Sequence, residues 1–249
     1  MSHDKIKAAA RARMAETGEP YVTARRAVTR QHQAAGGHIP LPPTTMLLWI
    51  NGPCGVGKTA TAFELNRRLP GSVVCDPAHV GYGMKRMLPP SLRHTFWQDI
   101  PAWRHCVLEL LRLTLAGHSG PVIAPMTLVN PGHFQEIIGR LRDDGVRLHH
   151  VALLAEPATV VRRLRARSLG REPRTQPWEV EVLDEWLEQL RRPEFAQHVH
   201  TDHQTVAQVA DIIARSAGLT IKPSTDGPMR AWLHRYATTA RTVRWLGSA

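Results

Sequence analysis

Apolar residues follow two alternating patterns along the chain. A continuous apolar run occupies 45–51, which is typical of a strand buried on both faces of a parallel sheet. Four further strands are expected at 72–75, 121–126, 149–155 and 198–201. Between them, apolar residues return every three or four positions, as on one face of a helix, at 58–69, 101–117, 131–145, 157–170, 179–192 and 205–218. This alternation predicts an α/β fold with a five-stranded, mostly parallel sheet and helices on both faces.

The two ends of the chain depart from this alternation. Residues 3–35 are rich in Ala and Arg and predict one or two helices, broken near 17–20, and the Gly- and Pro-rich stretch 36–43 predicts a linker. We expect a basic helical extension with its linker at 1–42, a central domain at 43–219 and a C-terminal helix at 220–249. Within the last segment, 228–247 places apolar residues at helical spacing with arginines on other faces, which predicts a basic amphipathic helix.

Composition bears on the compartment and the partners. No apolar run is long enough to span a membrane, and the charged N-terminus does not resemble a secretory signal. Three cysteines without metal-ligand spacing indicate free thiols and a cytoplasmic protein. The net charge of +11 is concentrated at the ends: residues 1–42 hold seven Lys or Arg against three acids, and 219–249 hold five against one. Such ends suit an anionic surface or are ordinary solvated helix faces.

One stretch between the first expected strand and helix has the spacing G-x-x-x-x-G-K-[ST]. Its residues are Gly52, Pro53, Cys54, Gly55, Val56, Gly57, Lys58 and Thr59, followed by Ala60. Glycines let the backbone wrap around a phosphate with its N–H groups inward, and the helix N-terminus adds a positive dipole end. Lys58 is expected to reach the β- and γ-phosphates, and Thr59 to offer its hydroxyl to Mg²⁺. The stretch predicts a P-loop that binds a nucleotide.

The P-loop does not select a reaction by itself. The chain has no N-K-x-D sequence for a guanine base and no apolar strand ending in Asp-Glu, so GTPases and motor ATPases fit poorly. A small-molecule kinase using ATP and Mg²⁺ fits better, and it needs a carboxylate beside the γ-phosphate. Asp76 directly follows the second strand, where open α/β sheets place ligands. We expect Asp76 to be the general base, a magnesium ligand, or both; a turn-forming Asp before Pro77 is the alternative.

An arginine-rich stretch is expected to act as a lid over 163–178. Arg163 and Arg167 are four residues apart on one helix, and Arg171 and Arg174 lie in the following loop. Such a lid would neutralise charge on the transferring phosphoryl group, although each arginine alone also fits a solvated helix face. By positional analogy, Asp202 and His203, after the fifth strand, are expected near the adenine base.

Candidate acceptor contacts come from two segments. Trp97, Trp103 and Arg104 precede or open the 101–117 helix, and Met126 and Thr127 end the third strand. A Trp can stack on a base or sugar, whereas packing in the core is the alternative for each of these side chains. For 228–247, contact with a membrane surface and packing against the core both stay open. Contact with the membrane would place the cytoplasmic protein at the inner face of the membrane.

Several of these stretches, taken in order, carry a family resemblance. The sequences "WINGPCGVGKT", "CDPAHVG", "IPAWR", "PMT" and "EIIGRLR" resemble those of the bacterial tunicamycin-resistance ATP-binding proteins, which are similar in fold to chloramphenicol phosphotransferase and shikimate kinase. The resemblance covers about 47–219 and leaves out 1–40. It implies ATP binding and protection against tunicamycin, a uridine-containing antibiotic that blocks transfer of sugar-phosphates to lipid carriers. It also implies that the general base at the end of the second strand is Asp76.

Three functions are therefore open. The first is an ATP-dependent phosphotransferase acting on a hydroxyl of tunicamycin or a related nucleoside. The second is an ATP-gated protein that sequesters the antibiotic without chemistry. The third, nucleic-acid binding through the basic ends, ranks last because the chain has no recognition motif. The oligomeric state is not predicted.

Overall fold

The computed structural model describes residues 3–34, 45–93, 96–166, 177–195 and 197–224. The chain divides into two compact units, residues 1–40 and 41–249, and each is described by itself. Just after the expected division at 219, the backbone N–H of Lys222 donates to the carbonyl of Arg68 over 2.8 Å, which joins this part of the chain to the helix expected at 58–69. The expected helix at 228–247 lies outside the described residues.

The first unit is a pair of helices. Helix α1 spans His3–Thr17 and α2 spans Tyr21–Ala34, so the break expected near 17–20 is confirmed. Gly18 makes the turn with a φ of 70°, a conformation that favours glycine. Ala10 and Ala24 are buried, and Arg13 pairs with Glu19. Small side chains let the two helices pack closely.

The second unit is built on a five-stranded sheet in the order β2-β3-β1-β4-β5. All four neighbouring pairs are parallel, which confirms the α/β fold expected from the sequence. The strands are β1 (Met46–Asn51), β2 (Val73–Val74), β3 (Val122–Pro125), β4 (Arg147–Leu154) and β5 (His198–His200). All six residues of β1 are buried, because helices cover both faces of this central strand.

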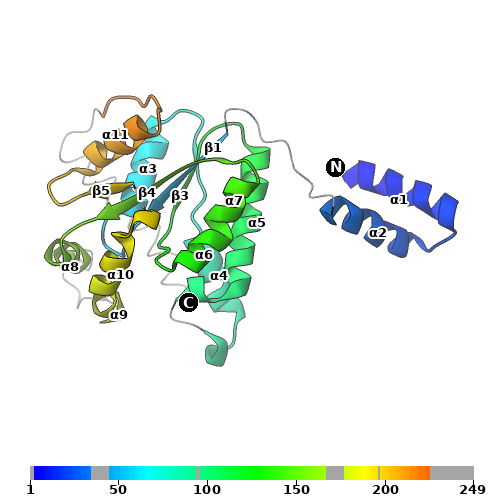
Figure 1. The fold of residues 1–249 in the computed structure, drawn as a ribbon, viewed down its shortest axis with the longest axis horizontal. Helices are drawn as coiled ribbons and strands as arrows, with labels where there is room; N and C mark the ends of the chain where they lie inside the picture. The colour runs from blue at the N-terminus through cyan, green and yellow to red at the C-terminus, as the bar shows by residue number, and fades with distance from the viewer. Residues whose placement is uncertain (1–2, 35–44, 94–95, 167–176, 196, 225–249) are drawn as a thin grey trace. The chain divides into compact units, whose positions relative to one another are not determined.

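Helices cover the sheet on both faces (Figure 1). Helices α3 and α11 pack together on one face, and α5, the α6–α7 helix and α10 lie on the other. The helices are α3 (Lys58–Arg68), α4 (Ala78–Met87), α5 (Pro101–Gly117), α6 (Pro131–Phe134), α7 (Arg140–Asp143), α8 (Pro157–Ala166), α9 (Pro177–Glu181), α10 (Leu183–Leu190) and α11 (Val206–Ser216). A π-helical turn, Gln135–Gly139, joins α6 to α7.

Some local features differ from the sequence-based expectation. The sequence analysis places no helix between Asp76 and Pro101, yet α4 lies there, together with short 3-10 turns at Pro90–Leu92 and Trp97–Asp99. Two glycines and a short length hide the helical periodicity of α4. The single helix expected at 179–192 is broken into α9 and α10 at Val182. No helix among the described residues is both long and apolar enough to cross a membrane.

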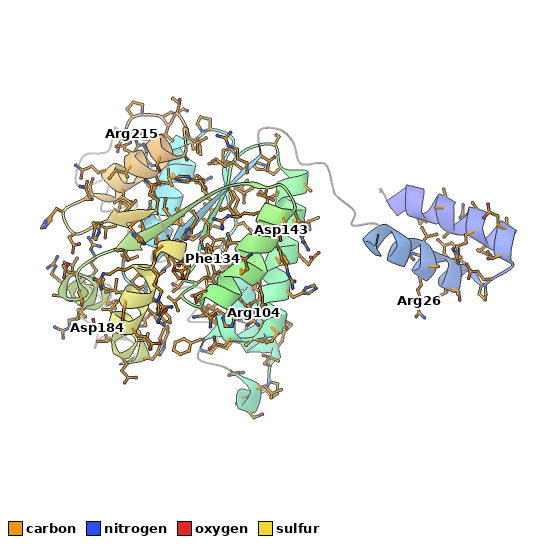
Figure 2. All side chains as sticks on the ribbon, viewed as in Figure 1. Arg26, Arg104, Phe134, Asp143, Asp184 and Arg215 are labelled. Carbon is orange, nitrogen blue, oxygen red and sulfur yellow. The ribbon has the colours of Figure 1, made fainter. Side chains whose placement is uncertain are left out.

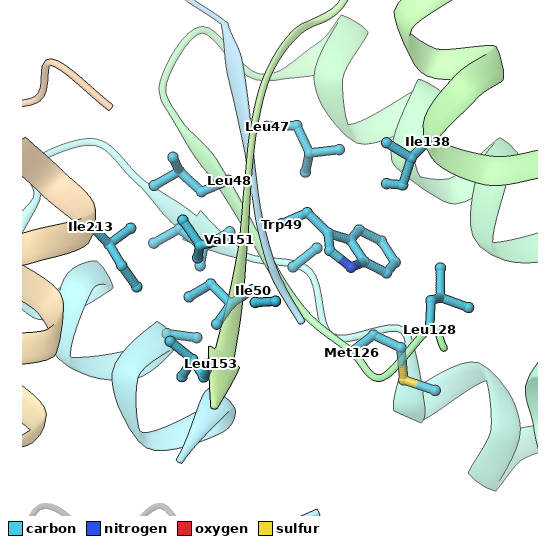
Figure 3. Close-up of a cluster of buried hydrophobic side chains, with 14 of the residues drawn as sticks. Leu47, Leu48, Trp49, Ile50, Met126, Leu128, Ile138, Val151, Leu153 and Ile213 are labelled. Atoms are coloured by element: carbon cyan, nitrogen blue, oxygen red, sulfur yellow. The ribbon is translucent and has the colours of Figure 1, made fainter. Parts of the chain in front are cut away.

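The core of the second unit has two layers, one on each face of β1 (Figure 3). Leu48 and Ile50 lie on the side of α11, where Ile213 meets them, whereas Leu47 and Trp49 point to the side of the α6–α7 helix. Successive side chains of a strand alternate between faces, so the continuous apolar run of β1 fills both layers. This core fixes the carboxyl end of β1, from which the P-loop begins.

Candidate nucleotide and acceptor site

The P-loop lies between β1 and α3, as the sequence predicts. Strand β1 ends at Asn51, α3 begins at Lys58, and Gly57 caps the helix in a left-handed conformation with a φ of 116°. The first N–H groups of a helix have no carbonyl one turn earlier to bind. The loop and the first turn of α3, where Thr59 and Ala60 lie, are therefore suited to hold an anion.

Two glycines of the loop are required by close contacts. A Cβ added at Gly52, where φ is 142°, would lie 2.8 Å from the carbonyl oxygen of Leu153. A Cβ at Gly55, where φ is 84°, would lie 2.8 Å from Cγ of Leu164. The loop is thus pressed against β4 and α8, and only glycine fits at these two positions. Pro53 and Val56 are buried within the loop, whereas Cys54 is half-buried.

Lys58 folds back over the loop. Its Nζ donates a hydrogen bond to the carbonyl of Pro53 over 2.9 Å. The ammonium group is half-buried and therefore sits over the P-loop, where a phosphate would displace or share this contact. This position is compatible with the predicted role of Lys58 at the β- and γ-phosphates.

Asp76 lies close to this lysine, just after β2. Burial raises the pKa of Asp76 above its ordinary value, while a hydrogen bond from the Ala78 N–H and the charges of His79 and Lys58 act against that rise. The Ala78 N–H donates to Oδ1 of Asp76 over 2.9 Å. The carboxylate therefore accepts a hydrogen bond from the first residue of α4 and also lies within electrostatic reach of the P-loop lysine. The turn-forming and catalytic interpretations of Asp76 are thus compatible.

The structure gives Arg163 a different position from the one expected. Its guanidinium donates to the hydroxyl of Thr201 (2.9 Å), to the carbonyl of Thr201 (2.6 Å) and to the carbonyl of Val56 (3.2 Å). These contacts join α8, the end of β5 and the P-loop. The geometry thus favours a positioning role for Arg163, because carbonyl oxygens already hold the guanidinium that was expected to meet the γ-phosphoryl group. Arg167, Arg171 and Arg174 lie outside the described residues.

Asp202 is also part of this junction. Its Oδ1 accepts a hydrogen bond from the N–H of Glu156 over 2.9 Å. Burial alone would raise the pKa of Asp202, but hydrogen bonds from Glu156 and Thr159 and the charge of Arg163 lower it below its ordinary value. The carboxylate thus fixes the loop after β5 to the start of α8. His203 is exposed beside it.

An aromatic group lies around the turn that precedes α5. Trp97 meets Tyr82 of α4 edge to face, with ring centroids 4.7 Å apart, and the neighbouring Phe96 meets Trp178 and Trp186 at 5.3 and 5.6 Å. Trp97 is half-buried and packs against the core. The sequence did not point to Tyr82 or Trp178 as members of this aromatic group. Tyr82 could have been found from its helical spacing to His79, shortly after Asp76.

Trp103 and Arg104 do not have the surroundings expected of acceptor contacts. Trp103 is fully buried, so it cannot stack on a ligand in this conformation. Arg104 is 8% exposed, and it donates to Glu136 over 2.7 Å and to the carbonyl of Gln98 over 2.6 Å. Figure 2 shows Arg104 on α5 beside the helix that carries Phe134. Both side chains fasten α5 to its neighbours, because α5 buries the face on which they lie.

Met126 and Thr127 are buried as well, at 7% and 6% exposed. The hydroxyl of Thr127 donates to the carbonyl of Gly52 over 2.7 Å, so it contacts the P-loop instead of the acceptor side. Asn51, which the sequence analysis did not single out, completes this contact because its Oδ1 accepts from the N–H of Gly52 over 2.8 Å. A polar Asn that ends an otherwise apolar strand is the signal that would have found it.

Comparison with known proteins shows the family to which this P-loop domain belongs. Residues 47–193 match the family model AAA_33, described as an AAA domain. The structure of the tunicamycin resistance protein of Deinococcus radiodurans is similar over 72% of this chain and 99% of that protein, with 30% sequence identity and a TM-score of 0.60. The chain belongs to the tunicamycin-resistance family of AAA_33 P-loop proteins. No match was found among curated proteins.

A more distant neighbour shows the fold alone. The adenylyl-sulfate (APS) kinase of Mycobacterium tuberculosis, in complex with AMPPNP and APS, matches 70% of this chain and 98% of its own, with 16% identity and a TM-score of 0.51. The chain therefore has a kinase-like P-loop fold of the nucleotide-binding type.

Proposed function

We propose that this protein is an ATP-dependent phosphotransferase that moves the γ-phosphoryl group of ATP to a hydroxyl of tunicamycin or a related nucleoside antibiotic. The observation that carries the proposal is the position of Asp76, a half-buried carboxylate directly after β2 and within electrostatic reach of the P-loop lysine. A protein that only holds the drug does not need a proton acceptor at this place. Tunicamycin is proposed as the acceptor because the chain belongs to the tunicamycin-resistance family.

The chain's own groups divide the work as follows. The N–H groups of the P-loop and the first turn of α3 hold the phosphates, and Lys58 neutralises charge on the β- and γ-phosphates. Asp76 accepts the proton of the acceptor hydroxyl as that oxygen attacks the γ-phosphorus. The bond from the γ-phosphorus to the bridging oxygen breaks, and ADP leaves with that oxygen. Atoms and charge balance without any further reactant.

The residues also fit the Mg²⁺ that such a reaction uses. The Thr59 hydroxyl and the Asp76 carboxylate are oxygen donors, which Mg²⁺ prefers. No cluster of three or more His, Cys, Asp or Glu side chains suited to a metal occurs among the described residues, so phosphate oxygens and water would complete the coordination, as is usual for this ion. The ion would neutralise charge on the phosphates.

Mass spectrometry of tunicamycin incubated with the protein, ATP and Mg²⁺ tests the proposal. A product heavier by one phosphoryl group is expected with the wild-type protein and not with Asp76→Asn. The matched control is Asp143→Asn, which removes an exposed carboxylate on α7 (Figure 2) and should leave the product unchanged. Unmodified drug that co-purifies with the ATP-bound protein would instead establish sequestration, and the phosphotransferase would be rejected.

A further inference from the structure

Two buried side chains outside the P-loop bind both polar backbone atoms of its first glycine. Oδ1 of Asn51 accepts from the N–H of Gly52 over 2.8 Å, and the hydroxyl of Thr127 donates to the carbonyl of Gly52 over 2.7 Å. Asn51 is 0% and Thr127 6% exposed. The N–H and the carbonyl of Gly52 are therefore both bonded to side chains of the protein and are not available to a ligand.

The side chain of Asn51 also forms hydrogen bonds with the loop that carries Thr127. Its Oδ1 accepts from the N–H of Leu128 over 2.9 Å, and its Nδ2 donates to the carbonyl of Leu128 over 2.8 Å. These bonds continue the β1–β3 pairing beyond its last backbone bond, from the Met126 N–H to the carbonyl of Ile50 (3.1 Å). Figure 3 shows Met126 and Leu128 on the same side of β1 as Trp49. The loop after β3 is thus fastened to the start of the P-loop.

The backbone at Gly52 has little freedom to take another course. A Cβ there would meet both the carbonyl oxygen of Leu153 and Cγ1 of Val56 at 2.8 Å. The direction of this peptide group sets the path of the loop that follows it. Backbone N–H groups bind a phosphate well only when they are already aimed at it, because no reorganisation is then needed.

We propose that Thr127 and Asn51 are positioning residues that aim the P-loop amides at the β-phosphate by fixing the peptide groups of Gly52. Thr127 lies in the loop two residues after the end of β3, and its hydroxyl bonds to the P-loop instead of to the metal or the acceptor. The proposal deepens the nucleotide site of the proposed function and rests on it. It changes the role expected for Thr127 from acceptor contact to support of the phosphate site.

Removing a single hydroxyl tests the role. Thr127→Val keeps the shape of the side chain and deletes the donor to Gly52. Thr45→Val is the matched control, because Thr45 is 4% exposed and its hydroxyl donates to the carbonyl of His118 over 2.9 Å, just before β1 at the strand's opposite end. Calorimetric titration with pyrophosphate and with Mg-ADP measures phosphate binding, and thermal unfolding measures stability.

Both Val variants should lower the unfolding midpoint by similar amounts, since each loses one buried hydrogen bond. Only Thr127→Val should weaken pyrophosphate and Mg-ADP binding, by about tenfold, and Thr127→Ser should restore both affinities. Wild-type affinity in Thr127→Val, or equal weakening in Thr45→Val, would overturn the positioning role. Failure of the wild-type protein to bind either ligand would instead count against the nucleotide site itself.

Discussion

Gly81 of α4 is packed directly against the indole of Trp97, which makes Gly81→Ala a sharp test of the acceptor side. A Cβ at Gly81 would lie 2.1 Å from Cδ2 and 2.3 Å from Cε3 of Trp97. Carbon atoms pack at about 3.5–4.0 Å, so the ring would have to move by roughly 1.5 Å. Gly83 of the same helix has no atom within 4 Å of an added Cβ and provides the matched control.

The two substitutions should change the free energy of unfolding in opposite directions. Alanine favours a helix over glycine by about 1 kcal/mol, and Gly83→Ala should gain up to that amount. Gly81→Ala gains the same term but incurs overpacking of about 1–3 kcal/mol. It also weakens the edge-to-face contact with Tyr82, worth about 0.5–1.5 kcal/mol. The net result is a destabilisation of about 2 kcal/mol for Gly81→Ala, and a difference of about 3 kcal/mol between the variants.

Urea unfolding followed by circular dichroism measures this difference. With an m-value of about 2–3 kcal/mol/M for a unit of this size, the midpoint of Gly81→Ala should fall by nearly 1 M, and that of Gly83→Ala should rise slightly. If Gly81→Ala is as stable as Gly83→Ala, the close packing of α4 on Trp97 is refuted.

Three further predictions concern charged side chains that are buried or half-buried. Arg68→Met should lower the free energy of unfolding by about 3 kcal/mol in chemical unfolding, because the buried guanidinium donates to the carbonyls of Lys222 and Ala207 and to Asp211. Asp211→Asn changes a side chain that is 42% exposed and should lower it by less than about 1 kcal/mol. The raised pKa of Asp76 means that the folded state binds more protons than the unfolded state just above the ordinary Asp pKa. The contribution of Asp76 to stability should therefore fall as pH rises from about 4 through the raised value. In thermal melts across pH, the stability of Asp76→Asn relative to the wild type should rise over that range; a difference that does not depend on pH would contradict the raised pKa of Asp76. Arg163→Met should weaken ATP binding in calorimetric titration and lower the unfolding midpoint, because it removes the guanidinium that bonds to both Val56 of the P-loop and Thr201. The neighbouring exposed Arg162→Met should leave both at wild-type values.

Much of the fold could be predicted because local patterns and the final packing agree. The apolar run at 45–51 became β1 with every residue buried, and the helix expected at 101–117 was found with the same bounds as α5. Pro101 and Gly117 favour the start and the end of that helix, as general preferences suggest. Helix α4 was missed because its two glycines weaken the helical signal, and one of them is there to admit Trp97, a residue distant in the sequence.

The P-loop could be predicted without a structure, since the spacing of Gly52, Gly57, Lys58 and Thr59 is a local pattern. The side chains that surround the loop could not be predicted in this way. Thr127 contacts the P-loop, Arg163 is held by Val56 and Thr201, and Trp103 is buried. The position of a residue at a strand end or on a helix face indicates that its side chain is near the site. The hydrogen-bond partners of that side chain, however, lie far away in the sequence and depend on how the helices pack on the sheet. Buried polar groups take whatever partners that packing provides, and no local pattern encodes them.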